Sequence, residues 1–419
     1  MKRSPLIVIF TTVFIDLVGF GIVIPVLPFY AEGTAFNATP RTVGLLFASY
    51  SIMQLIFAPI LGSLSDKYGR RPVLLLSIIG TGIGFLILGL ANSLLLLFIG
   101  RILDGITGGN ISTAQAYIAD ITTKENRAKG MGLIGAAFGL GFIIGPAIGG
   151  ILSRWGIHVP FFFAASLCFA NAILLYFRLP ETVTPDHPAR NSAARGRSFG
   201  DVFSSLRQPK LAFVLIIYFL FIVAFSIMTT SFSLYTMFRF GYDAQHTGYL
   251  FAYVGLIAVI IQGGLIGRLV KRFGEMPLVI FGAFCFAISL FAVPFVGPAA
   301  GGLAGLLIGG GIFSMGNSLA GPALTSLASK SVEAEQQGVV LGVTQSTASL
   351  ARAVGPFLAA VLINSSIAHL GADGATHYMS DYSLFVTFWT AAAIMLLAFF
   401  LAFYYRLNRR QILAADFRR

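Results

Sequence analysis

The stretch GSLSDKYGRRPVL, residues 62–74, places one acid, three bases, two glycines and a proline between two long apolar runs. A diverged copy of it, GRLVKRFGEMPLV, recurs at 267–279. Glycine can end a helix in a left-handed conformation, and proline suits the first turn of the next helix. The stretch therefore predicts a tight turn between two helices, and its recurrence predicts two related halves.

The composition of the chain indicates a membrane protein. The 419 residues are 57% hydrophobic and 11% charged, with a mean hydropathy of +0.85, whereas soluble domains are about a quarter charged. Cys168 and Cys285 stand singly in apolar runs, and the five histidines do not cluster with them. The sequence therefore predicts neither a disulfide framework nor a metal site.

The apolar runs predict an all-α membrane protein with twelve spanning helices. Each run reaches the roughly 20 residues that a spanning helix needs and is longer and more continuous than a barrel strand. The polar stretch 179–210 predicts a cytoplasmic linker, with a short interfacial helix near 199–207, between six-helix bundles at 1–178 and 211–419. The predicted spans are 6–30, 43–65, 72–92, 94–119, 130–153, 159–178, 211–238, 246–267, 277–296, 300–328, 338–367 and 383–405.

The positions of the basic residues predict the orientation. Of 28 lysines and arginines, 23 fall in the termini and loops on one side of the predicted spans and three on the other side. Basic loops stay in the cytoplasm, so both termini are expected there. The net charge of +12 then reflects anchoring to anionic lipid rather than nucleic-acid binding, and nothing in the chain demands a protein partner, so we expect a monomer.

A second pair of matching segments strengthens the two-fold repeat. GLGFIIGPAIGG at 139–150 aligns with SLARAVGPFLAA at 349–360, and the turn at 62–74 aligns with its copy at an offset of 205. Symmetry between two helical halves is typical of transporters that bind their substrate between the repeats.

Four phrases together resemble the major facilitator superfamily. The turn at 62–74 is similar to the loop 2–3 signature of that family. DLVGFGIVIPVLP at 16–28, RILDGITGG at 101–109 and the segment at 139–150 resemble the signatures of its drug:proton antiporters. LPET at 179–182 follows span 6 as in relatives, and together with GNISTAQAYIAD at 109–120 the phrases most resemble the tetracycline-resistance-like branch.

The resemblance implies a function and a location. It implies a multi-pass protein of the inner (plasma) membrane that exports small amphiphilic compounds in exchange for protons, as in multidrug or tetracycline efflux and antibiotic resistance. The proton is the coupling ion, and no other cofactor is implied. In this family the best-known tetracycline exporters carry further ionisable residues in spans 3, 8 and 9. The interiors of these spans hold none here, which argues against tetracycline itself.

The resemblance also implies a gate at the first turn. Asp66 and Arg70 correspond to residues that latch the cytoplasmic side, and Arg71 belongs to the same cluster. Lys271 stands where the second copy would carry the acid, so a latch there needs other charges. Arg352, in span 11, either pairs near this gate or lines a cavity.

Three further ionisable residues lie inside predicted spans and are candidates for proton coupling. Such residues cost roughly 2.5–3.5 kcal/mol on insertion scales and are functional by default. Asp16 is either a proton carrier or an acid that hydrogen-bonds a neighbouring helix. Arg101 and Asp104 share one helical face, so they form either a local ion pair or a group in which the arginine, facing the cavity, exchanges partners.

Polar and aromatic residues of the spans predict a cavity for amphiphilic substrates. For each single residue the alternative is a hydrogen bond between helices. The candidates are Tyr50, Gln54, Asn110, Gln115, Tyr218, Phe225, Gln262, Asn317 and Gln345.

Small residues recur every four positions in span 5, at Ala137, Gly141, Gly145 and Gly149. Such a stripe lets two helices approach closely, and Pro146 adds a kink. The stripe predicts either static packing against span 8 or a seam that slides during transport.

Two alternatives to a proton-coupled exporter remain open at this point. One is a uniporter or symporter of a small metabolite such as a sugar or organic anion, and the other is a membrane receptor or scaffold without flux. An enzyme is not expected, because the chain contains neither a GxSxG nor an HExxH motif.

Overall fold

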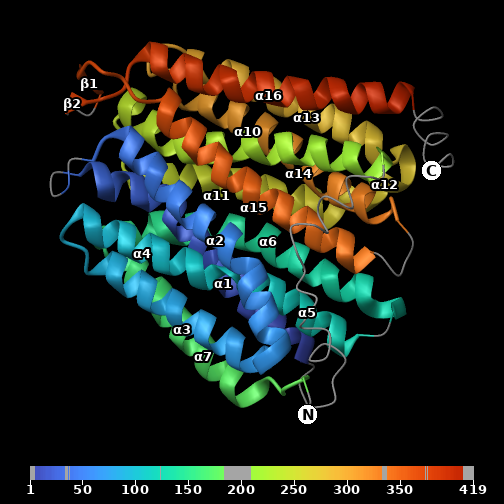
Figure 1. Ribbon diagram of the computed structural model, residues 1–419. Coiled ribbons are helices and arrows are strands. Elements are labelled where there is room, and N and C mark those ends of the chain that lie inside the picture. Colours follow the sequence, from blue (N-terminus) through green and yellow to red (C-terminus); the bar gives the residue numbers. More distant parts are fainter. Residues whose placement is uncertain are drawn as a thin grey trace.

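The computed structural model in Figure 1 describes residues 5–33, 36, 38–122, 124–183, 209–332, 337–372, 374 and 376–408, and long helices dominate it. The helices coloured blue to green gather in the lower part of the view, and those coloured yellow to red gather in the upper part. The helices are α1 (Pro5–Glu32), α2 (Pro40–Tyr68), α3 (Arg70–Gly89), α4 (Leu94–Thr107), α5 (Ile111–Ile121), α6 (Lys124–Ser153), α7 (Val159–Arg178), α10 (Pro209–Phe240), α11 (Ala244–Ile260), α12 (Ile266–Phe273), α13 (Glu275–Ala292), α14 (Gly302–Ser329), α15 (Gln337–Leu362) and α16 (Asp381–Leu407).

The predicted all-α membrane architecture is confirmed. Within the described ranges, eleven helical segments are long and apolar enough to cross a membrane, and α15, with 26 residues, is the remaining long helix. The division of the chain into two bundles by a linker at 179–210 stays a prediction. Most of that linker, including the expected interfacial helix at 199–207, lies outside the described residues.

Three predicted spans differ in detail from the structure. Span 4 is interrupted by the 3-10 turn η1 (Gly108–Asn110), and span 8 contains the π-helix η2 (Ile261–Leu265) before α12 continues. Span 11 ends at Leu362 rather than at 367. The chain after it forms a hairpin of β1 (His369–Leu370) and β2 (Thr376–His377).

The two repeated turns have the geometry that their glycines predict. Gly69 separates α2 from α3 with φ +109°, and Gly274 separates α12 from α13 with φ +80°. Positive φ values are readily adopted by glycine. Glu181 closes the first turn, because its carboxylate accepts hydrogen bonds from the backbone N–H groups of Arg70 (2.9 Å) and Arg71 (3.0 Å).

Helices of the two halves meet along α2 with α15 and along α6 with α11. Span 2 aligns with span 8 and span 5 with span 11, so one of these seams is the repeat of the other. Each seam is close because it uses small residues: Gly44 lies against Ala360 in the first, and Gly150 lies against Gly248 in the second. The helix of α6 continues through Pro146, whose carbonyl oxygen also faces Gly248.

The glycine stripe of α6 faces a different helix from the one expected. Gly141, Gly145 and Gly149 all face residues 17–22 of α1, so that the two backbones touch. The stripe therefore joins α1 to α6 within the first half. The expected packing of this stripe against span 8 is wrong, because a different face of α6 contacts α11.

Adding one methyl group at the second seam tests its close packing. We expect Gly248→Ala to lower the free energy of unfolding by about 1–3 kcal/mol, because its Cβ would overlap the backbone of Gly150. Gly267→Ala is the matched control, since a Cβ there meets no atom within 4 Å. Thermal unfolding in detergent compares the two variants, and an equal midpoint shift would contradict the seam.

Candidate functional site

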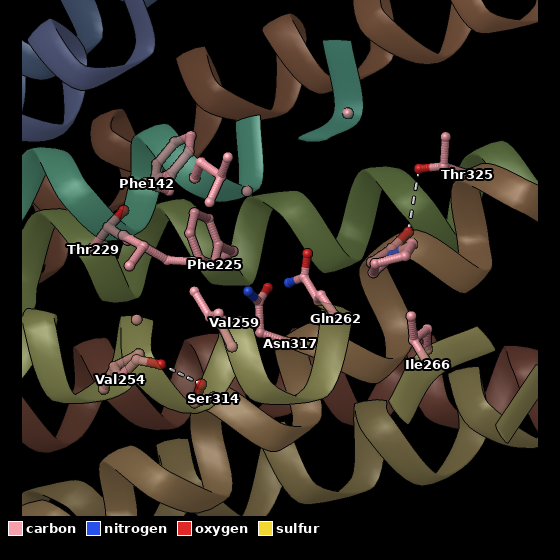
Figure 2. A pocket seen from close by; sticks show the side chains of 18 of the residues that line it. Phe142, Phe225, Thr229, Val254, Val259, Gln262, Ile266, Ser314, Asn317 and Thr325 are labelled. Atoms are coloured by element: carbon pink, nitrogen blue, oxygen red, sulfur yellow. Dashed lines mark hydrogen bonds between the residues drawn. The ribbon is translucent and has the colours of Figure 1, made fainter. Parts of the chain in front are cut away.

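A cavity of about 880 Å³ lies between the halves, with walls from α1, α5 and α6 on one side and from α10, α11, α14 and α15 on the other (Figure 2). Most of its lining is apolar or aromatic. Seven residues predicted to act in the cavity or the gate line it: Gln115, Tyr218, Phe225, Gln262, Asn317, Gln345 and Arg352.

The cavity extends to the end of the bundle that carries the two repeated turns. Its lining includes Ser329, the last residue of α14, and Ile266 at the start of α12. A side chain built at Gly263, also in the lining, would meet open space. The opposite end is closed by the glycine contacts of the seams and by a buried pair in which His377 Nδ1 lies 3.1 Å from Glu32 Oε2.

A ladder of aromatic rings crosses one side of the cavity. The ring of Phe142 on α6 meets that of Phe225 on α10 edge to face at 5.8 Å, and Phe225 stacks on Phe313 of α14 at 6.2 Å. Phe20 continues the ladder from Phe142 to Tyr50 at 5.5 Å and 5.2 Å. Such rings offer a large apolar surface with defined stacking geometry to a bound molecule. Phe142 and Phe313 were missed from the sequence, because nothing distinguishes them among 40 phenylalanines.

Side-chain amides form a polar patch in the cavity wall. Figure 2 shows Gln262 and Asn317 next to each other, below Phe225. Gln262 belongs to the π-helix η2, and its Nε2 donates to Ser318 Oγ at 3.4 Å. π-helical turns are rare and occur frequently at functional sites, and this one carries a cavity residue.

Arg101 lies outside the cavity wall, in a buried cluster of the first half. Its side chain is fully buried, Nη1 lies 2.7 Å from Asp104 Oδ2, and the guanidinium lies 4.3 Å from the ring centroid of Tyr50. The amide of Gln54 donates to the hydroxyl of Tyr50 at 2.9 Å and to the carbonyl oxygen of Gly108 at 3.0 Å. The cluster thus joins α4 to α2 through hydrogen bonds and a cation–π contact.

Asp16 lies at the edge of this cluster and is partly exposed. Asn110 Nδ2 donates to its Oδ1 over 3.4 Å, and Asp104 lies within electrostatic range of it. Within the part of the chain that the structure describes, Arg101 Nε and Nη2 and Asn110 Oδ1 have no hydrogen-bond partner. Buried donors and acceptors in this state are rare, so the cluster holds unused capacity to bind a carboxylate or water.

Tyr50, Gln54, Asn110 and Arg101 are not among the residues that line the cavity of about 880 Å³, and their roles in transport stay predictions. The reason for their position is the close approach of α4 to α2: Gly105 lies directly against the backbone of Tyr50. At this distance the polar side chains of the two helices point into the contact between them.

The predicted gate residues form a network within the first half. Asp66 pairs with Arg70, whose Nε also lies 3.0 Å from Asp120 Oδ2 and whose Nη1 donates to Ser65 Oγ at 2.7 Å. Arg71 Nη2 donates to the carbonyl oxygen of Tyr176 at 2.5 Å. In this conformation, therefore, the described contacts of Asp66 hold α2 to α3 rather than to the other half.

The second half repeats one of these bridges with reversed charges. Glu275 stands at the repeat position of Arg70, and its carboxylate accepts from Lys330 at the end of α14 and from Ser326 Oγ at 3.1 Å. The Arg70–Asp120 pair likewise joins the start of α3 to the end of α5. The alignment of the two turns places Glu275 at the position that corresponds to Arg70. Its partner, Lys330, lies 55 residues further along the chain and was not predicted.

The buried ion pair can be tested by a double-mutant comparison. We expect Arg101→Gln to lower the free energy of unfolding by roughly 3–5 kcal/mol, because it leaves Asp104 buried without its cation. Combining it with Asp104→Asn should restore most of that loss. Denaturant unfolding in detergent measures both, and additive losses in the double variant would argue against a coupled pair.

Comparisons with known proteins agree with this geometry. The chain is 36% identical to the tetracycline resistance protein, class B, of Escherichia coli over 84% of this chain and 87% of that protein. It is 31% identical to multidrug resistance protein 2 of Bacillus subtilis over 87% and 91%, respectively. The crystal structure of the human organic anion transporter MFSD10 (TETRAN) superposes with a TM-score of 0.69 at 25% identity, over 96% and 99% of the two chains. The sequence profile of the Major Facilitator Superfamily matches residues 9–356, and the protein belongs to this family of multi-pass membrane transporters.

Proposed function

We propose that the protein is a proton-coupled secondary transporter of the inner membrane that exports small amphiphilic compounds by alternating access. The observation that carries this proposal is the buried acid–base cluster of the first half, which lies beside a large aromatic cavity between the halves. Relatives named for tetracycline and multidrug resistance support the direction of transport and the kind of substrate.

The cavity supplies the binding site for the substrate. With both termini in the cytoplasm, as the basic loops predict, the open end of the cavity faces the cytoplasm. The apolar part of a compound packs on the ladder of Phe142, Phe225 and Phe313, and its polar part bonds to the amides of Gln262 and Asn317. This is the usual composition of a site for small amphiphiles: a mainly apolar lining with a few orienting polar groups.

Asp16 is the proposed proton carrier. It is the partly exposed acid of the cluster, so water can deliver a proton to its carboxylate. Arg101 keeps its charge throughout, because a guanidinium does not titrate in proteins. Loss of the proton creates a second carboxylate near Asp104, and the unused donors of Arg101 are available to bind it. The protonation state of Asp16 therefore biases the contact of α1 with Asn110 and α5.

The conformational change is a rocking of the two halves at their seams. Export requires the closed end to open, which separates Gly150 from Gly248 and Glu32 from His377. The cytoplasmic end closes at the same time and brings the turns at Gly69 and Gly274 towards the opposite half. The charged networks around these turns are the proposed gates.

Asp16→Asn tests the proton coupling. In proteoliposomes, we expect this variant to lose uptake or efflux driven by an imposed pH gradient, because an amide cannot carry the proton. Exchange of substrate across the membrane without a gradient should persist. Asp381→Asn is the control, since Asp381 is an exposed acid paired with Arg239 at the surface.

Each alternative has its own outcome in this assay. Unchanged pH-driven flux in Asp16→Asn would contradict the assigned carrier. A uniporter would ignore the pH gradient in the unaltered protein, and a receptor or scaffold would show no flux at all.

A further inference from the structure

A proline of α1 deprives one carbonyl group of this helix of its usual hydrogen-bond donor. Proline has no N–H, so a proline inside a helix removes the bond to the carbonyl oxygen four residues before it. Pro28 lies inside α1 and is buried, and the carbonyl that it affects is that of Ile24. Lipid supplies no donor, so this carbonyl needs a partner from elsewhere in the protein.

The partner of this carbonyl comes from the other half of the molecule. Ser233 Oγ on α10 donates to the carbonyl oxygen of Ile24 at 3.3 Å, and both residues are buried. Serine hydroxyls satisfy carbonyls that proline frees in spanning helices. Here the serine belongs to the first helix of the second half, so the hydrogen bond joins the two halves.

This hydrogen bond lies at the boundary between the cavity and the closed end. Ile24 lines the cavity, and Thr229, labelled in Figure 2, is the last described residue of α10 in its lining. Ser233 follows Thr229 by about one helical turn on the same face of α10, and its side chain is fully buried. The bond therefore belongs to the first layer of contacts that separates the cavity from the far side of the membrane.

We infer that Ser233 is a positioning residue of the transport cycle, which holds the closed end shut by bonding to the carbonyl that Pro28 leaves without a donor. Opening of this end separates α1 from α10, and water then hydrates both polar groups. Without the hydroxyl of Ser233, the closed conformation buries the Ile24 carbonyl without a donor, whereas the open conformation loses nothing. The hydroxyl thus stabilises the closed conformation selectively. The inference rests on the proposed alternating access for the existence of an open conformation.

The ratio of open to closed protein is measured on the full-length chain in lipid nanodiscs, with Cys168 and Cys285 replaced by alanine. Spin labels attached at Trp155→Cys and Tyr382→Cys, two exposed positions at the closed end, report the distance across this end. The alkylation rate of Ala244→Cys, at a buried position of the seam between α6 and α11, follows the open fraction even where that fraction is small.

Ser233→Ala should raise the ratio of open to closed protein, and with it the alkylation rate, by about 10-fold, because a buried carbonyl without a donor penalises the closed conformation. Ser231→Ala is the matched control, since Ser231 is fully buried on the same helix and its hydroxyl has no hydrogen-bond partner among the described residues. We expect this control to leave the ratio within about twofold.

A double variant assigns the effect to the proline. In Pro28→Ala, residue 28 regains an N–H group that can bond to the Ile24 carbonyl within α1. Adding Ser233→Ala to this variant should therefore change the ratio by less than about threefold, because the carbonyl keeps a donor.

The inference is overturned if Ser233→Ala leaves the ratio unchanged, if Ser231→Ala raises it equally, or if the effect of Ser233→Ala is as large in the presence of Pro28→Ala as without it. Flux in proteoliposomes is measured separately. A shifted ratio in a protein that shows no flux would reject the proposed transport and keep the role of Ser233. Proton-driven flux with an unshifted ratio would reject the role of Ser233 and keep the proposed function.

Discussion

The structure depends on the enclosure of one positive charge. Lipid offers no partner for Arg101, so α2 and α4 must close around it and supply the ring of Tyr50 and Asp104. A small residue makes this enclosure possible, because Gly105 lets α4 approach α2 closely. The first half consequently encloses the ion pair of Arg101 and Asp104. The second half, through α10, α11, α14 and α15, provides most of the cavity wall.

Features that depend on local signals could be predicted from the sequence, whereas features that depend on tertiary packing could not. Helix number and turn geometry follow from local signals, since an apolar run must span the bilayer and Gly69 and Gly274 need positive φ. The direction of a side chain is a different matter. A helix that is apolar on all faces gives no periodicity to orient it, so Gln54 and Gln115 looked equivalent. Only tertiary packing places Gln54 against α4 and Gln115 in the cavity.

The repeat preserves the position of a bridge but not its sign. In both halves an ion pair ties the start of the helix after the turn to the end of a neighbouring helix: Arg70 with Asp120, and Glu275 with Lys330. What the symmetry retains is therefore the mechanical link between helices. Both pairs lie at helix ends, but they differ in exposure: Arg70 is buried, whereas Lys330 is exposed.

The π-helix η2 has a mechanical consequence. Its widened turn holds one residue more than the α-helix around it, and Gly263 and Gly264 leave it free of side-chain obstruction. If the surplus residue were absorbed into the regular winding, everything after it would swivel by about 100° about the helix axis, the angle that one residue subtends. The segment carrying Lys271 would then rotate about the helix axis, while α11 kept its contact with α6 at Gly248.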